Sequence, residues 1–172
     1  EGGRGTLESA PKTQDPRPET PCVPDLLTPA DTRPYLLEQI DDAAVVQLYA
    51  DGFHALPLTE KVLVWHLYQA ALAGRDIYYD QRYRHNLAMR AILEAVITHP
   101  QGIADDVLAE VTRYTKLFWL NTGPYNNLTA RKFVLKITPA AFSAAVKAAV
   151  QNGASVATRP GESVDAMLSR LE

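Results

Sequence analysis

Apolar residues that recur every three or four positions, in runs separated by helix-stopping residues, decide the fold class of this chain. The runs begin near Thr32 and continue to the end of the 172-residue sequence. Such spacing places apolar side chains on one face of an α-helix, whereas strands would need strict alternation. The sequence therefore predicts a mainly α fold, a helical domain with one or two short strands.

The first two helices are expected before position 75. Thr32 can act as the N-cap of a helix that stops at Asp51 and Gly52. A second helix is expected between Thr59 as N-cap and Gly74 as C-terminal stop. Its sequence, LPLTEKVLVWHLYQAALAG, is apolar on nearly all sides, which predicts a central, buried position. The apolar stripe of the first helix consists of Leu36, Leu37, Ile40, Ala44 and Leu48.

Three further helices and a strand are expected downstream. A third helix should cover 76–99, since Pro100 closes it, and a fourth should cover about 104–120. The run RKFVLKI, 131–137, is typical of a short strand. Thr138 then caps a helix that has proline at its first position and ends at Asn152 and Gly153.

The last apolar stripe lies at the end of the sequence. In ESVDAMLSRLE the apolar residues fall at i, i+3, i+4 and i+7, yet no helix-stopping residue follows. A helix of about ten residues is marginal unless another element covers its stripe. Because the chain also begins at Glu1 rather than at methionine, we interpret both ends as cut. The stripe consists of Val164, Met167, Leu168 and Leu171.

Composition divides the chain into two parts and excludes several classes of protein. Residues 1–31 are rich in proline and poor in apolar residues, which predicts a disordered linker before a helical part at 32–172. The net charge is −3 with no positive stripe, which argues against nucleic acid as a partner. No apolar run approaches the roughly 20 residues of a membrane span. Cys22 is the only cysteine, so no internal disulfide is expected.

The polar residues do not form a catalytic or metal-binding motif. No two histidines have the spacing that places both on one helix face, and the chain contains no H-E-x-x-H. Asp76 and Asp80 lie one helical turn apart, a spacing that suits a carboxylate pair. We favour a structural interpretation in which both stabilise the first turns of a helix and Asp80 pairs with Arg84. Arg75 and Asp76 are interpreted as an architectural pair at a helix junction.

The segment FWLNTGPYNNLTARKF, 118–133, is the best candidate for a functional site. Asparagine, glycine and proline after a helix suit a plain turn. Amide side chains, however, donate and accept hydrogen bonds at once, which holding an extended peptide requires. Tyr125 and Leu128 could form the apolar wall of a subsite. Both interpretations remain open on composition alone.

Two blocks of sequence add a family resemblance. AALAGRDIYYDQRYRHNLAMRAILEAV, followed by FWLNTGPYNNLTARKFV, resembles the dipeptidyl-peptidase III family of zinc exopeptidases, particularly its bacterial branch. The similarity spans about 35–142. It implies a two-lobed enzyme around a wide cleft, in which zinc is held by an H-E-x-x-x-H helix and a further glutamate. This chain contains none of those ligands.

The resemblance therefore implies that 32–172 is the N-terminal portion of a peptidase lobe. The chain would form part of the substrate cleft of an enzyme that releases dipeptides from peptide N-termini. Its partners would be the peptide substrate and the remaining, zinc-bearing lobe of its own polypeptide. Zinc would be the cofactor of the full-length enzyme, while this segment would bind no metal and be inactive alone.

The same resemblance assigns roles within the candidate segment. Asn127 and Leu128 match positions that line the subsite for the peptide's N-terminal residues, although other members have a small polar residue and an aromatic there. Asn121, Gly123 and Tyr125 match the framework of the loop. The candidate substrate-binding residues are Asn121, Gly123, Tyr125, Asn126, Asn127 and Leu128.

Two alternatives stay open. One is a small helical interaction module that binds a partner through the exposed stripe of the last helix. The other is a catalytically inactive relative that still binds peptides. Both a cytoplasmic and a bacterial periplasmic location are compatible with the sequence.

Overall fold

The computed structural model describes residues 32–156 and 158–171. All the helices and strands of the described residues lie in the second of the chain's two units, Pro34–Glu172. The linker predicted at 1–31 lies outside the described residues. Within the described part, five α-helices, a 3₁₀ helix and two short strands confirm the prediction of a mainly α fold.

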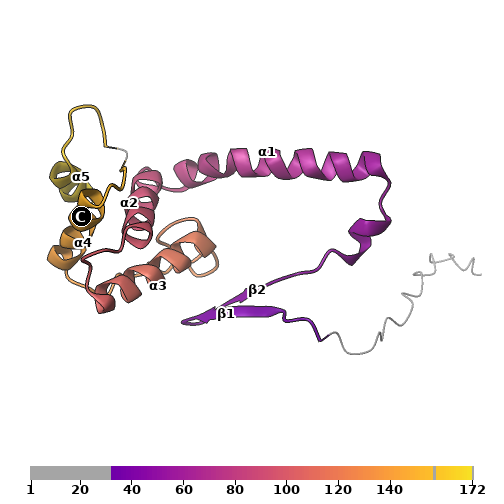
Figure 1. The fold of residues 1–172 in the computed structure, drawn as a ribbon, viewed down its shortest axis with the longest axis horizontal. Helices are drawn as coiled ribbons and strands as arrows, with labels where there is room; N and C mark the ends of the chain where they lie inside the picture. The colour runs from indigo at the N-terminus through magenta and orange to yellow at the C-terminus, as the bar shows by residue number, and fades with distance from the viewer. Residues whose placement is uncertain (1–31, 157, 172) are drawn as a thin grey trace, which may run out of the picture. The chain divides into compact units, whose positions relative to one another are not determined.

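Figure 1 shows the order of these elements along the chain. They are β1 (Leu36–Ile40), β2 (Ala43–Val46), the 3₁₀ helix η1 (Asp51–Ala55), α1 (Leu58–Arg82), α2 (Asn86–Thr98), α3 (Asp105–Asn121), α4 (Pro139–Gln151) and α5 (Val164–Leu171).

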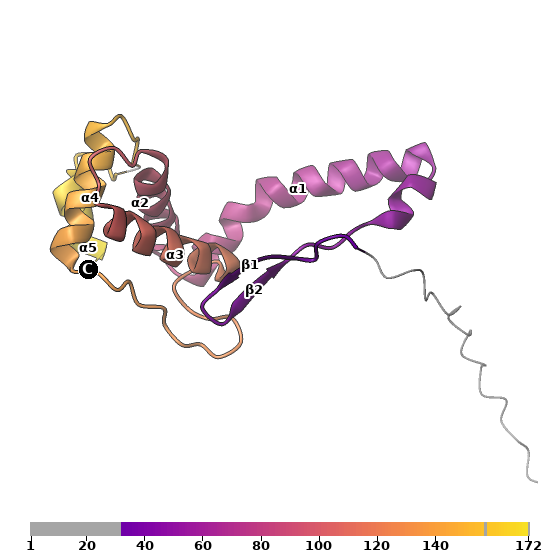
Figure 2. The ribbon, with the colours of Figure 1, turned by 60° about the horizontal axis from the view of Figure 1, so that its bottom comes forward.

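The hydrophobic core lies among α2, α3, α4 and α5, which gather at one end of the second unit (Figure 2). Val96, Val111 and Val146 contribute fully buried side chains from three of these helices. The C-terminal end of α1 joins this core through Tyr79, whose ring stacks on Phe118 at 5.9 Å between centroids. Packing of the apolar faces of short helices against each other is what makes each of them stable.

The helix expected from Thr32 is wrong, because this segment forms a β-hairpin. β1 and β2 pair antiparallel, with Leu36 opposite Val46 and Ile40 opposite Ala43. Asp41, in the turn, has a φ of 53°, a left-handed conformation that aspartate tolerates better than most residues. The apolar residues that suggested a helix stripe are mostly not buried, since Ile40 is the only buried residue of the two strands.

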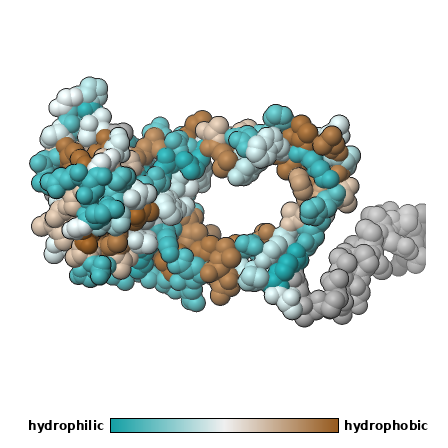
Figure 3. All heavy atoms as spheres, in the orientation of Figure 1, coloured by the Kyte–Doolittle hydropathy of each residue, from teal (hydrophilic) through white to brown (hydrophobic). Residues whose placement is uncertain are grey.

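The expected boundaries and burial of the second helix are also wrong. α1 begins at Leu58 after Pro57 as N-cap, and it continues through Gly74 to Arg82. A glycine inside a helix costs only about 1 kcal/mol relative to alanine, which its helix-forming neighbours offset. Of all α1 residues only Tyr79 is buried. Figure 3 shows hydrophobic residues exposed along this helix, most densely toward its start.

Of the predictions for the downstream elements, two are wrong and two are confirmed. The predicted third helix is split, because 76–82 belong to α1 and α2 starts at Asn86. The strand predicted at 131–137 is wrong: the described residues there form only an isolated bridge between Tyr125 and Lys132, with no strand alongside to extend the ladder. α3 agrees with 104–120 within a residue. Thr138 does cap α4, since its Oγ1 accepts a hydrogen bond from the Ala141 N–H at 3.1 Å.

The stripe of the last helix is covered by the chain's own core. Met167 and Leu168 of α5 are buried, and α5 packs on α4. The Ser163 hydroxyl accepts a hydrogen bond from the Ala166 N–H at 3.1 Å and so caps the helix. The expectation of an exposed stripe is therefore wrong, and an interaction module that uses this stripe loses its basis.

Candidate functional site

The candidate segment leaves α3 through two residues with positive φ. Thr122 has a φ of 50° and Gly123 a φ of 147°. The Gly123 N–H donates to the Phe118 carbonyl at 3.0 Å, which closes the end of the helix. A side chain at 123 would place its Cβ only 3.0 Å from Nδ2 of Asn86. This position therefore requires glycine both for its backbone conformation and for the space beneath it.

Asn86, the first residue of α2, lies under this turn and connects three helices. Its side chain is buried, at 1% exposure. Its Nδ2 donates to the Tyr79 carbonyl at 3.0 Å and to the Thr122 carbonyl at 3.2 Å. Its Oδ1 is buried and has no hydrogen-bond partner among the described residues. Sequence reasoning missed Asn86, although a lone amide ahead of an apolar helical stripe was a visible signal.

Asn121 and Asn126 use their side chains to hold the backbone of the asparagine loop, which we define as residues 122–133. The Asn121 amide donates to the Leu117 carbonyl at 2.9 Å and accepts from the Asn127 N–H at 3.0 Å. Oδ1 of Asn126 accepts from the N–H of Leu128 and of the residue after it, each at 2.9 Å. Two of the three predicted binding amides therefore stabilise the loop itself.

The loop closes on itself and exposes its tip. The Asn126 N–H donates to the carbonyl of residue 131 at 2.9 Å, next to the bridge between Tyr125 and Lys132. Tyr125 and Asn127 are exposed, and Leu128 is 95% exposed. Tyr125 and Leu128 therefore stand open to solvent in this chain, and an apolar subsite wall there would need a second surface opposite them.

Arg82, which sequence reasoning also missed, contacts the loop from the last turn of α1. Its Nη1 donates to Asn127 Oδ1 and, at 3.1 Å, to Thr122 Oγ1. Positions 75, 79 and 82 lie on one face of a helix that continues past Gly74. The sequence does not reveal this face, because Gly74 is typical of a helix end and predicts two separate helices there.

Ion pairs among Arg75, Asp76 and Arg90 form a network that joins α1 to α2. Asp76 Oδ1 accepts from Arg90 Nη1 at 2.8 Å and from Arg75 Nε at 3.4 Å. The hydrogen bond from Arg90 lowers the pKa of Asp76. The Arg90 guanidinium also lies 4.8 Å from the centre of the Tyr79 ring. A cavity of about 400 Å³ opens here, lined by Arg75, Tyr79, Arg90, Glu94, Trp119 and Thr122.

The helix-dipole interpretation of Asp76 and Asp80 is wrong. Both lie in the last turns of α1, where negative charge is unfavourable for the helix dipole. Among the described residues, Arg84 Nε donates to His85 Nε2 at 3.0 Å, and the expected ion pair between Arg84 and Asp80 does not form. Arg75 and Asp76 do form a pair, within α1 rather than at a helix junction. Asp76 is stabilised by its two arginines instead of by the helix end.

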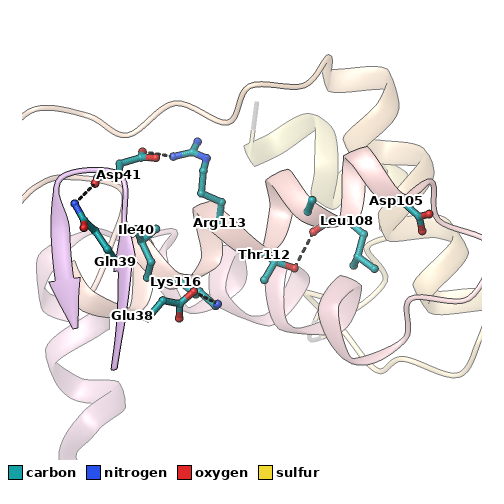
Figure 4. Close-up of a pocket in the computed structure, with 10 residues that line it drawn as sticks. Glu38, Gln39, Ile40, Asp41, Asp105, Leu108, Thr112, Arg113 and Lys116 are labelled. Carbon is teal, nitrogen blue, oxygen red and sulfur yellow. Dashed lines mark hydrogen bonds and ion pairs between the residues drawn. The ribbon is translucent and has the colours of Figure 1, made fainter. Parts of the chain in front are cut away.

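A larger cavity, of about 620 Å³, lies between the hairpin and α3 (Figure 4). Lys116 pairs with Glu38 at 2.6 Å, and Arg113 pairs with Asp41 at 2.6 Å and with Glu110 at 2.7 Å. The hydrogen bond from Arg113 lowers the pKa of Glu110. Both cations are neutralised by carboxylates of the chain. The ion pairs tie the hairpin to α3, and neither Lys116 nor Arg113 is left unpaired for an anionic ligand.

The described residues were also compared with what a metal site and a membrane-spanning helix require. Across 32–156 and 158–171, no group of three or more histidine, cysteine, aspartate or glutamate side chains is placed to hold a metal ion. In the same part of the chain, every helix falls short of the length and apolarity needed to cross a bilayer.

No protein-family model matches this chain, and no curated protein matches it either.

Proposed function

We propose that this chain is the N-terminal, substrate-cleft-forming segment of a zinc-dependent exopeptidase that releases dipeptides from peptide N-termini. The observation that carries the proposal is the asparagine loop, whose backbone is fixed by hydrogen bonds from asparagine side chains while its tip is exposed. Asn86, Asn121 and Asn126 hold the backbone, so Asn127 and Leu128 are presented to solvent. The resemblance to dipeptidyl-peptidase III in the same residues is the second support.

The loop would contribute binding and orientation. Its backbone is fixed by side-chain and backbone hydrogen bonds, so little conformational entropy is lost when a peptide binds. The Asn127 amide can hydrogen-bond the backbone of an extended peptide. Holding that peptide in one register is an orientation effect, which aligns the scissile bond with catalytic groups elsewhere.

The described residues do not fit a zinc site, since they hold no suitable group of ligands. In the proposal, zinc belongs to the remaining lobe of the polypeptide and would polarise the scissile carbonyl there. The contribution of the present chain is restricted to binding and orienting the peptide.

The exposed surface of α1 supports the proposal that the zinc-bearing lobe of the same polypeptide packs against this helix. No charged residue lies between Lys61 and Arg75, and Trp65 is 58% exposed. Burying one large apolar side chain contributes roughly 1.5–3 kcal/mol, so this helix gains stability when it is covered. Apolar residues occur on all its sides, so contact along one face would leave the others exposed. A surrounding lobe of the same polypeptide covers more of it than a single flat contact does.

The direct test uses the full-length natural polypeptide loaded with zinc. We expect it to release dipeptides from the N-terminus of unlabelled peptides, as followed by mass spectrometry. Asn127→Ala should raise KM more than it lowers kcat, with little change in melting temperature. The matched variant Asn126→Ala removes the side chain that holds the loop, and it should lower the melting temperature instead. Release of no dipeptides, or an unchanged KM in Asn127→Ala, would contradict the proposal.

The second candidate is an interaction module, and the exposed α1 is the observation that favours it. In that case α1 would be covered by a separate protein, and the full-length polypeptide would carry no peptidase activity. A third outcome, peptide binding without hydrolysis, would indicate a catalytically inactive relative. Replacing Trp65 and Leu72 by glutamine separates the candidates. If another part of the same polypeptide covers α1, the double variant should be less stable and should hydrolyse peptides more slowly. If a separate protein covers α1, the double variant should lose only its complex with that protein.

A further inference from the structure

Arg82 is held in one orientation by uncharged groups. Nη1 donates to Asn127 Oδ1, to Thr122 Oγ1 at 3.1 Å and to the Tyr78 hydroxyl at 3.3 Å. The guanidinium carbon lies 5.5 Å from the centre of the Tyr78 ring. Because all these partners are neutral, they orient the guanidinium without neutralising its charge.

The other edge of the same guanidinium is open. Among residues 32–156 and 158–171, no acceptor lies within hydrogen-bond distance of Nε or Nη2, and no carboxylate pairs with Arg82. Arg75 and Arg90, in the neighbouring network, share the Asp76 carboxylate instead. Nε and Nη2 are the two donors that bind a carboxylate side-on with two parallel hydrogen bonds.

Asn127 places further donors at the same site. Its Oδ1 accepts from Arg82, so its two Nδ2 hydrogens remain for another acceptor. No described residue accepts a hydrogen bond from them. A positive guanidinium beside this amide repels the α-ammonium group of a peptide and attracts a carboxylate.

We propose that Arg82 and Asn127 form a subsite for a carboxylate group of the bound peptide. This inference rests on the proposed function, in that the ligand is a peptide on the asparagine loop. It also goes beyond it, because it places a negative group rather than the peptide's ammonium group at Asn127. The preorganised arginine loses little freedom on binding, which favours a specific contact over a loose ion pair.

The carboxylate has two sources in a peptide: an acidic side chain near the amino terminus, or the free carboxyl terminus of a short peptide. Four tetrapeptides distinguish them. They are Ala-Asp-Ala-Ala amide, Ala-Asn-Ala-Ala amide, Ala-Ala-Ala-Ala amide and Ala-Ala-Ala-Ala with a free carboxyl terminus. Dissociation constants are measured on the full chain by NMR titration, so no hydrolysis is needed.

We expect one carboxylate peptide to bind about tenfold more tightly than its neutral counterpart, the gain typical of a charge-assisted hydrogen bond. A gain for the aspartate peptide identifies the side chain as the source, and a gain for the free acid identifies the carboxyl terminus. Arg82→Gln should remove this preference, and Arg82→Lys should remove most of it, because lysine keeps the charge but lacks the planar fork. Arg131→Gln, which removes an equal charge from the same loop, should retain the preference.

The Arg82 Nε–H resonance of the unmodified chain gives a readout that needs no variant. It should shift on titration with the preferred carboxylate peptide and stay in place with the neutral one. Equal affinities within both peptide pairs would overturn the proposal, as would a preference that survives in Arg82→Gln or an unmoved Nε–H resonance. Failure of the full-length polypeptide to release dipeptides would defeat the proposed function alone, because binding is measured here without turnover.

Discussion

Replacing Gly123 by alanine tests whether the turn after α3 is held by Asn86. The change has two separate energetic consequences. A non-glycine residue at a φ of 147° is strained, at roughly 1–3 kcal/mol for such a conformation. The added Cβ also lies 3.0 Å from Asn86 Nδ2 and 3.1 Å from its Oδ1, closer than ordinary contact.

The second consequence depends on how Asn86 responds. Its amide is buried and donates to the Tyr79 and Thr122 carbonyls, so moving it weakens two hydrogen bonds worth about 1 kcal/mol each. Together these terms predict a loss of about 2–4 kcal/mol in the free energy of unfolding. For a chain of this length that lowers the melting temperature by roughly 4–16 °C.

Thermal unfolding followed by circular dichroism measures the change, and Gly153→Ala is the matched control. Gly153 also has a positive φ, 99°, but its Cβ would meet nothing within 4 Å. This control should therefore show only the backbone strain, about 1–2 kcal/mol. In the double variant with Asn86→Ala, the loss should fall short of the sum of the single losses by about 1 kcal/mol, because the steric conflict is gone. Equal losses for the two glycine variants, or additive losses with Asn86→Ala, would refute this account of the turn.

Three other perturbations test separate parts of the fold. Gly74→Ala should raise the free energy of unfolding by about 1 kcal/mol in denaturant titrations, since Gly74 lies inside α1 with open space around its Cβ position; destabilisation would indicate a break in α1 there. Thr138→Ala should lower it by about 1 kcal/mol through loss of the α4 cap, and Thr138→Ser, which keeps the hydroxyl, should restore most of it. Hydrogen bonds from the Arg170 side chain and the Arg159 N–H lower the pKa of Glu162 from 4.5 to about 2. Because the folded-state pKa is the lower one, this stabilisation is complete above pH 4.5 and is lost as the pH falls toward 2. Glu162→Gln should therefore flatten the dependence of melting temperature on pH in that window, and an unchanged slope would show that the ion pair does not contribute.

The candidate site shows how far side-chain chemistry can be predicted from spacing. On composition alone, the sequence left open whether the asparagines after α3 form a plain turn or a surface that binds a peptide. It did not indicate that the side chains of Asn121 and Asn126 bond the backbone of neighbouring residues, while Asn127 accepts a hydrogen bond from an arginine 45 positions earlier. Contacts between residues so distant in sequence depend on the packing of α1 and α2 against α3, which no local pattern encodes.

The sequence alone determined the helical class, the extent of α3 and the cap of α4, because those features depend on residues within one or two turns of each other. Tertiary structure decided the rest. The spacing of Leu36 to Leu48 fits a helix face, but a turn at Asp41 and ion pairs to α3 hold this segment as a hairpin. Tertiary structure also decided that α1 continues through Gly74 and that the stripe of α5 is buried on α4, since both outcomes depend on which elements pack against these helices.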